Sequence, residues 1–186
     1  VITTPFGKVF HTGDWKFDED PIIGSPALPQ ELRAIGDQGI LALIGDSTNV
    51  FNAESAGSEG RVRDTLIREL KDRDGRILVT TFASNAARLD TLGRVAEATG
   101  RHVIVAGRSL KRIIAVAKAN GYLVDFPEPL DEEDAKDLPR NEQLIICTGC
   151  QGEGRAALHR IAFGEHKNIH LAPKDLVVFS SKVIPG

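Results

Sequence analysis

Residues 144–161 combine three short patterns that together limit the possible fold. Leu144–Cys147 is an apolar run of strand length, Thr148–Gly154 is polar and rich in glycine, and Ala157–Ala162 has apolar residues at helical spacing. This order predicts a strand, a loop and a helix. Glycine allows a ligand to approach the main chain closely, and backbone N–H groups at the start of a helix favour anions. We therefore expect the loop to bind phosphate.

The same order, an apolar β-branched run that ends in small or polar residues, recurs along the chain. Helical patterns separate most of these runs, which is typical of a mostly parallel sheet with helices on both faces. In such a doubly wound α/β sheet the carboxyl ends of the strands share one edge, where ligands bind. We expect the polar ends of all these segments to converge there; besides the glycine-rich loop, the segments are Ile40–Asn49, Ile77–Asn85, Val103–Ser109 and Val177–Gly186.

Several element boundaries follow from the local pattern. Residues 1–14 predict one strand, and Leu28–Ile35 predicts a short helix. Ile40–Ile44 is continuously apolar, which predicts a strand that is covered on both faces. A short turn joins Ile169–Ala172 to Leu176–Phe179, so these two segments are expected to form an antiparallel pair.

Charge and composition restrict the functional class. The chain has 186 residues, a net charge of -3 and a pI near 6.0, so a nucleic acid would have to be held by a local patch. No apolar run approaches the roughly 20 residues that cross a bilayer, and a cytoplasmic location is expected. Cys147 and Cys150 have the C-x-x-C spacing of redox and zinc sites, but no second pair completes a zinc site. We expect Cys147 to be a small apolar residue of its strand.

Three charged side chains at strand ends are candidates for chemistry. Asp14 suits either a turn or a metal site. Asp46, which Ser47–Asn49 follow, suits either the capping of local N–H groups or metal and phosphate chemistry, and both interpretations stay open. Arg108 lies between a strand and a helix expected over Ile113–Ala119. Its guanidinium group is suited to binding a phosphate, and a salt bridge is the alternative.

The polar segments at the strand ends form an ordered set: His11–Asp14, Asp46–Asn49, Phe82–Asn85, Gly107–Ser109, Thr148–Glu153 and Ser180–Gly186. In order and spacing they resemble bacterial ribonuclease J, a family that joins a metallo-β-lactamase domain to an inserted β-CASP domain. The resemblance covers essentially the whole chain. It implies that residues 1–50 are part of the metallo-β-lactamase domain and that residues 51–186 form the β-CASP domain.

The resemblance implies a zinc-dependent ribonuclease that acts on single-stranded RNA, both from a 5′-monophosphorylated end and internally. Two zinc ions would activate a water and offset charge on the phosphoryl oxygens. Asp14 matches the aspartate that bridges the two ions, and Asp46 matches an acidic residue that hydrogen-bonds a catalytic histidine. The residues expected to bind RNA or phosphate, from the resemblance and from their place at strand ends, are Ser47, Thr48, Asn49, Ser84, Asn85, Arg108, Gly149, Cys150, Gln151, Gly152, Ser180 and Ser181.

Four positions depart from the family pattern. Cys150 stands where a serine is usual, which exchanges a hydroxyl for a weak thiol donor. Gly154 and Arg155 replace a usual Pro-Met pair, and Lys182 replaces a usual serine. Because Arg155 and Lys182 add positive charge near the predicted anion site, they favour RNA binding.

The His-x-His-x-Asp-His zinc motif of the family is missing from this sequence. We therefore expect the chain to be part of a longer protein, to hold no stable pair of zinc ions by itself and to be inactive alone. The parent protein is expected to form homo-oligomers. An alternative from another class is a non-catalytic Rossmann-like module that binds a nucleotide or a phosphate at the strand ends.

Overall fold

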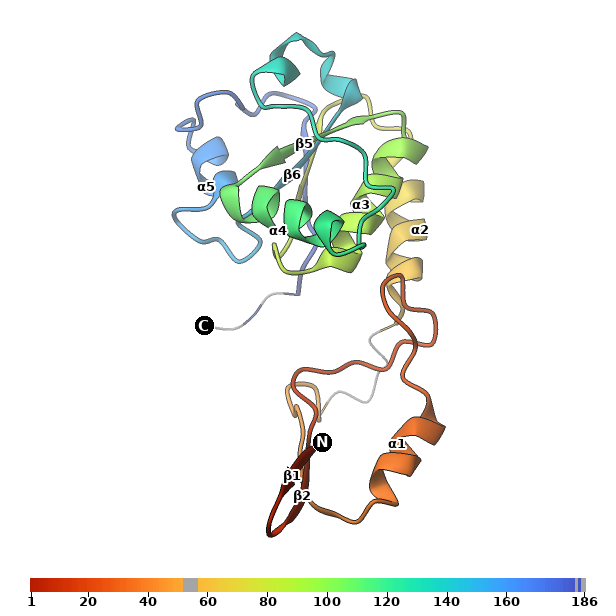
Figure 1. The fold of residues 1–186 in the computed structure, drawn as a ribbon. Coiled ribbons are helices and arrows are strands. Elements are labelled where there is room, and N and C mark those ends of the chain that lie inside the picture. Colours follow the sequence, from red (N-terminus) through yellow and green to blue (C-terminus); the bar gives the residue numbers. More distant parts are fainter. Residues whose placement is uncertain (52–56, 183, 185–186) are drawn as a thin grey trace. The chain divides into compact units, whose positions relative to one another are not determined.

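A computed structural model describes residues 1–51, 57–182 and 184, and divides the chain into two compact units, residues 1–60 and residues 61–186 (Figure 1). The first unit contains helix α1 (Pro29–Gly36) and a three-stranded sheet in the order β1-β2-β3. β1 (Ile2–Thr4) and β2 (Gly7–His11) are antiparallel, and β3 (Ile40–Ile44) is parallel to β2.

The single strand predicted over residues 1–14 is wrong, because the chain reverses direction between β1 and β2. The Thr4 hydroxyl donates a hydrogen bond across this turn to the carbonyl oxygen of Gly7, at 2.8 Å. Gly7 has a φ of 143°, a conformation that favours glycine over other residues.

The prediction that β3 is covered on both faces is also wrong. Leu41 and Leu43 are 70% and 62% exposed, and Ile44, on the opposite face, is 52% exposed. Helix α1 buries none of its residues, so it adds no apolar layer to this sheet. A continuous apolar run therefore indicates a strand here without indicating its burial within this chain.

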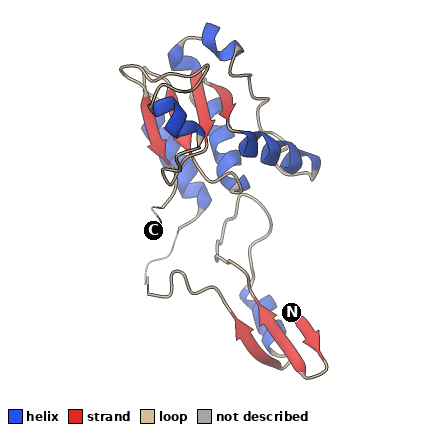
Figure 2. Cartoon of the chain, turned by 90° about the vertical axis from the view of Figure 1, so that its left-hand side faces the viewer, coloured by secondary structure: helices blue, strands red, loops and turns tan. Residues whose placement is uncertain are grey.

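The second unit contains a four-stranded sheet in the order β5-β6-β4-β7, and all its neighbouring strands are parallel. This agrees with the expected mostly parallel α/β fold, and Figure 2 shows helices packed around the strands. The strands are β4 (Ile77–Thr80), β5 (His102–Ala106), β6 (Gln143–Cys147) and β7 (Leu176–Phe179). The helices are α2 (Glu59–Leu70), α3 (Ala86–Ala98), α4 (Arg108–Ala119) and α5 (Ala157–Ala162), with short 3-10 turns at Asp134–Asp137 and Arg140–Glu142.

The core of the second unit lies around its two central strands. Every residue of β4 and β6 is buried, which agrees with the apolar runs 77–79 and 144–147 that make up most of these strands. From α3, Leu89, Leu92 and Val95 are fully buried in the same unit. Because the central strands are held by this core, the positions of the loops that follow them are set by packed structure.

The expected antiparallel pair near the end of the chain does not form. β7 is parallel to β4, and the segment Ile169–Ala172 is not a strand. Its backbone is held by side chains instead: the Asp175 carboxylate accepts a hydrogen bond from the Ala172 N–H at 3.1 Å, and the guanidinium groups of Arg76 and Arg140 donate to the carbonyl oxygen of His170. Side-chain contacts distant in sequence thus override the local turn signal.

Helix α4 begins five residues before the helix expected over Ile113–Ala119. Gly107 is its N-cap residue, with a φ of 135°. A Cβ atom added to Gly107 would lie 3.1 Å from Cγ2 of Thr148, so the absence of a side chain lets the start of α4 approach the end of β6. Arg108 is therefore the first residue of the helix.

Candidate functional site

The carboxyl ends of the four parallel strands in the second unit lie along one edge of the sheet, as expected for such strands. We call this region the carboxyl edge; it comprises Thr81–Asn85, Gly107–Ser109, Thr148–Gly152 and Ser180–Lys182. The polar segment Asp46–Asn49 follows β3, which belongs to the separate sheet of the first unit. The prediction that all five strand ends belong to one sheet is therefore wrong for this segment.

Gln151 connects two parts of the carboxyl edge that are not neighbours in the sheet. Its Nε2 donates hydrogen bonds to the carbonyl oxygen of Lys182 at 2.7 Å and to Oγ of Ser181 at 3.4 Å, and its Oε1 accepts from the N–H of Ile184 at 3.0 Å. Ser181 in turn donates from Oγ to the carbonyl oxygen of Cys150 at 3.1 Å. The glycine-rich loop after β6 is thereby fastened to the segment after β7.

The end of β4 supplies a second group of predicted residues. Ser84 is exposed, and the Asn85 side chain caps α3, because its Oδ1 accepts from the N–H of Arg88 at 3.0 Å. The Arg88 guanidinium group donates to both the carbonyl oxygen, at 2.9 Å, and the hydroxyl of Ser180. The ends of β4 and β7 are joined through this arginine.

The glycine-rich loop depends on close packing under it. Gly149 has a φ of 117°, and a Cβ atom added there would lie 2.9 Å from Cβ of Leu158. Gly152 has a φ of 78° but faces open space. Cys150 is only 6% exposed, so its thiol lies under the loop, and burial raises the pKa of the neighbouring Cys147 thiol to about 12. Cys147 is a buried apolar residue, as expected.

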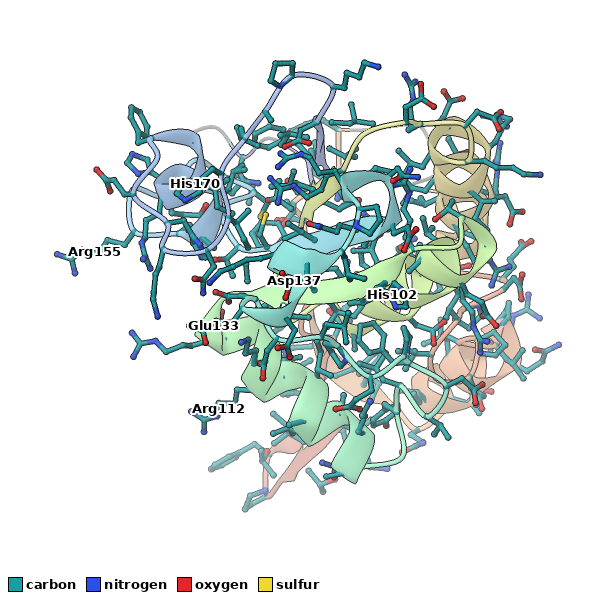
Figure 3. The ribbon with its side chains drawn as sticks, turned by 90° about the horizontal axis from the view of Figure 1, so that it is seen from above. His102, Arg112, Glu133, Asp137, Arg155 and His170 are labelled. Carbon is teal, nitrogen blue, oxygen red and sulfur yellow. The ribbon has the colours of Figure 1, made fainter. Side chains whose placement is uncertain are left out.

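A cavity of about 650 Å³ opens beside the ends of β5 and β6. We call it the basic pocket, because its described lining residues include five basic side chains and one carboxylate, Glu132. Figure 3 shows Arg155 projecting from the segment before α5, on the same side of the unit as Arg112 of α4. The lining residues are Gly107, Arg108, Ser109, Lys111, Glu132, Thr148, Arg155, Ala157, Arg160, His166, Lys167 and Asn168.

His166 lies in the wall of the basic pocket as a buried residue. Its Nδ1 accepts hydrogen bonds from the N–H groups of Asn168 and Ile169, at 3.4 and 3.2 Å. Its Nε2 lies 3.6 Å from Oε2 of Glu132. Burial lowers the pKa of His166, and the nearby Arg160 acts in the same direction, whereas Glu132 opposes the shift.

In the first unit, Asp46 adopts the capping role that was one of its two interpretations. Its Oδ1 accepts from both the N–H, at 2.8 Å, and the hydroxyl of Thr48, and its own N–H donates to Oγ1 of Thr12 at 3.3 Å. The hydrogen bonds from Thr48 hold the pKa of the Asp46 carboxyl below its ordinary value. Asp14 is exposed in the loop after β2.

Within residues 1–51, 57–182 and 184, no group of three or more His, Cys, Asp or Glu side chains is arranged to hold a metal ion. Over the same residues, no helix is long and apolar enough to cross a membrane. Asp14, the residue expected to bind metal, therefore lacks a set of further ligands in the described part of the chain.

Comparison with known proteins decides the family. Residues 74–186 match the family described as Ribonuclease J, beta-CASP domain. The chain belongs to the ribonuclease J family. Ribonuclease J of Sinorhizobium meliloti is 41% identical over 186 residues, which cover 100% of this chain and 33% of that protein. Ribonuclease J 1 of Streptococcus pyogenes is 42% identical over 187 residues, with the same coverage.

Ribonuclease J of Thermus thermophilus is 39% identical over 186 residues, which cover 100% of this chain and 32% of the relative. The chain thus spans about a third of the length of these curated ribonuclease J relatives. The resemblance found in the ordered motifs is confirmed, including its extent over the whole chain.

The predicted site residues did not include four basic residues that lie near the strand ends: Arg88, Lys111, Arg160 and Lys167. Arg88 lies in the first turn of α3, where it reaches the end of β7, and Arg160 and Lys167 line the basic pocket. Arg88, Lys111 and Arg160 lie on helices, where a basic residue is most often solvated, and Lys167 lies in a loop, so residue type alone gave no reason to select them. For Arg88, the signal would have been its position in the helical turn that directly follows the polar strand-end segment Phe82–Asn85.

Proposed function

We propose that this chain forms the RNA-clamping part of a ribonuclease, which hydrolyses phosphodiester bonds of single-stranded RNA as a 5′-3′ exonuclease and an endonuclease. A 5′-monophosphorylated end would be the preferred substrate, and the parent protein would act as a homo-oligomer in the cytoplasm. Residues 1–50 would belong to the metallo-β-lactamase domain and residues 51–186 to the β-CASP domain. Family membership supports this assignment.

The observation that best supports RNA clamping is the polar, cross-connected carboxyl edge. Gln151 and Arg88 join the ends of β6, β4 and β7 into one surface rich in hydroxyl, amide and backbone groups. Such groups are suited to phosphate and sugar oxygens, which account for a large share of contacts between proteins and nucleic acids. Ser84, Ser180 and Ser181 would contact the RNA there.

Zinc would activate a water for attack on the phosphodiester bond when bound in the parent protein. Asp14 would be one of its ligands. Because the described residues gather no cluster of three ligating side chains, the remaining ligands would come from other parts of the protein, and the chain alone would be inactive. Asp46 would accept a hydrogen bond from a histidine in another part of the parent protein. Its Oδ1 at present accepts from Thr48, and the histidine would replace that contact.

Fluorescence anisotropy with labelled RNA tests the proposal. The chain is expected to bind single-stranded RNA with an affinity that rises with length and falls as salt increases. A 5′-monophosphate should bind more tightly than a 5′-hydroxyl. Tight binding of AMP, without any gain for longer RNA, would contradict clamping and favour the Rossmann-like nucleotide module.

A substitution at the carboxyl edge tests whether the RNA binds at this surface. Gln151→Ala releases the glycine-rich loop from the segment after β7, and we expect RNA affinity to fall about three- to tenfold. Asn120→Ala is the matched control, because Asn120 is an exposed amide that also donates to a backbone oxygen, Val116 O at 2.8 Å, but at the far end of α4. Equal affinities for both variants and the unchanged chain would show that RNA does not bind at the carboxyl edge.

A further inference from the structure

The basic pocket contains three guanidinium groups that have no acidic partner within the described residues. Arg108, Arg155 and Arg160 take part in no ion pair there, although all three line the cavity. The two lysines differ. Nζ of Lys111 lies 3.6 Å from Oε1 of Glu132, and Nζ of Lys167 lies 2.9 Å from Oε1 of Glu133. The positive charge left for a ligand therefore resides mainly on the three arginines.

The start of α4 adds uncharged donors to the same wall. The first N–H groups of a helix have no partner inside the helix, and the helix dipole favours an anion beside them. Gly107, the N-cap residue, supplies no side-chain hydrogen bond to these groups. Gly107, Arg108 and Ser109 all line the pocket. Guanidinium groups and N–H donors thus line the same cavity.

We propose that the basic pocket binds a compact oligophosphate, the phosphate chain of a nucleoside di- or triphosphate. A single terminal phosphate has a charge of only about −1.5 to −2 near neutral pH. Each further phosphoryl group adds negative charge, so a chain of two or three groups matches three arginines better than orthophosphate does. The volume of about 650 Å³ falls in the usual range for nucleotide-sized ligands.

This inference goes beyond RNA clamping because it assigns a distinct ligand, an oligophosphate, to a cavity at the ends of β5 and β6. The pocket shares Gly107–Ser109 and Thr148 with the carboxyl edge, but neither Gln151 nor Arg88 lines it. The same phosphate chemistry can come from a free nucleotide or from the 5′-triphosphate end of an RNA. Glu132 also lines the pocket and repels either one. Removing the charge of its carboxylate should therefore strengthen anion binding, whereas removing an arginine should weaken it.

Isothermal titration calorimetry of the chain with inorganic tripolyphosphate and with orthophosphate tests the shared chemistry. Tripolyphosphate is expected to bind at least tenfold more tightly than orthophosphate, at one site per chain. Equal affinities, or binding at many sites, would overturn the proposal. ATP and a short RNA with either a 5′-triphosphate or a 5′-hydroxyl distinguish the sources: a gain for the triphosphorylated RNA over ATP assigns the RNA end, and the reverse assigns the free nucleotide.

Substitutions of residues that line the pocket test whether tripolyphosphate binds there. Arg160→Gln and Arg155→Gln are each expected to weaken tripolyphosphate binding about tenfold, since each removes a charged donor. Glu132→Gln is expected to strengthen it several-fold. Arg112→Gln is the matched control, because Arg112 is an exposed arginine of α4 that does not line the pocket. Circular dichroism checks that each variant is folded. Unchanged binding in both arginine variants, or an equal loss in Arg112→Gln, would contradict the assignment.

Discussion

Nη2 of Arg76 lies 3.1 Å from Oδ2 of Asp175, in an ion pair whose side chains are only 6% and 2% exposed. Asp175 also accepts from Arg140, so one carboxylate holds two arginines and the backbone N–H of Ala172. Burial lowers the pKa of Arg76, and the charge of Asp175 opposes that shift. This cluster fixes the segment between α5 and β7, where the sequence pattern predicted a strand.

Asp175→Asn is expected to lower the free energy of unfolding by about 3–5 kcal/mol, because it leaves a buried guanidinium group without its counter-charge. Urea denaturation followed by circular dichroism measures the change. Asp125→Asn is the control: Asp125 pairs with Arg94 at 2.8 Å, but both side chains are substantially exposed, and a change under about 1 kcal/mol is expected. Similar losses in the two variants would show that burial does not set the strength of the Arg76 pair.

Gly149→Ala is expected to destabilise the glycine-rich loop more than Gly152→Ala. Both glycines have positive φ, which costs another residue about 1–2 kcal/mol. Only at Gly149 does the new methyl group also meet Leu158, at 2.9 Å, and overpacking adds roughly 1–3 kcal/mol. Thermal unfolding of both variants checks the order, and a larger loss for Gly152→Ala would contradict the packing described under the loop.

Stability is expected to decline as the pH falls below about 6.5, the ordinary pKa of histidine. Because the folded-state pKa of His166 is lowered, the unfolded chain takes up this proton first, and the stabilisation present above 6.5 is lost as the pH falls through the folded-state pKa. Protonation of Nδ1 also removes the acceptor for the Ile169 N–H.

Urea midpoints between pH 7.5 and pH 5 measure this dependence for His166→Gln, which cannot take up the proton. The variant is expected to show a flatter profile than the unchanged chain. An unaltered slope in His166→Gln would show that groups other than His166 determine the acid response.

The Cys147 thiol is expected to resist alkylation in the folded protein. Its pKa of about 12 keeps the thiol protonated near neutral pH, and the side chain is fully buried in β6. Iodoacetamide labelling followed by mass spectrometry should modify Cys147 only after denaturation. Rapid modification without denaturant would indicate that β6 opens readily.

The sequence predicted the second unit better than the first for a physical reason. In β4 and β6, long apolar runs are buried on both faces, so hydrophobic pattern and environment agree. In β3 an equally apolar run is exposed, because burial depends on what packs against a strand and not on the strand itself. The expected antiparallel pair failed for a related reason, since Arg76 and Asp175 are 99 residues apart and leave no local pattern.

The sequence also predicted only some features of the candidate site. Motif order indicated which strand ends are polar, and parallel pairing brings four of them to one edge. The sequence pattern could not show that the Gln151 amide holds the segment after β7, or that Asn85 caps α3. The sequence indicated Arg108 and Arg155, but it could not show that the fold brings them together with Arg160 around one cavity.

The Gln151 contacts have a consequence for how the edge can respond to a ligand. β4 lies between β6 and β7 in the sheet, yet one side-chain amide joins the segments that follow the two strands on either side of it. The Gln151 contacts therefore hold the segments after β6 and β7 together without any contact to Ser84, and Arg88 adds a second link from α3 to Ser180. In the proposed clamp, the exposed Ser84 would be the part of this edge that is free to adjust to an RNA strand, because Asn85 is held as the cap of α3 and Gln151 fastens the segments on either side.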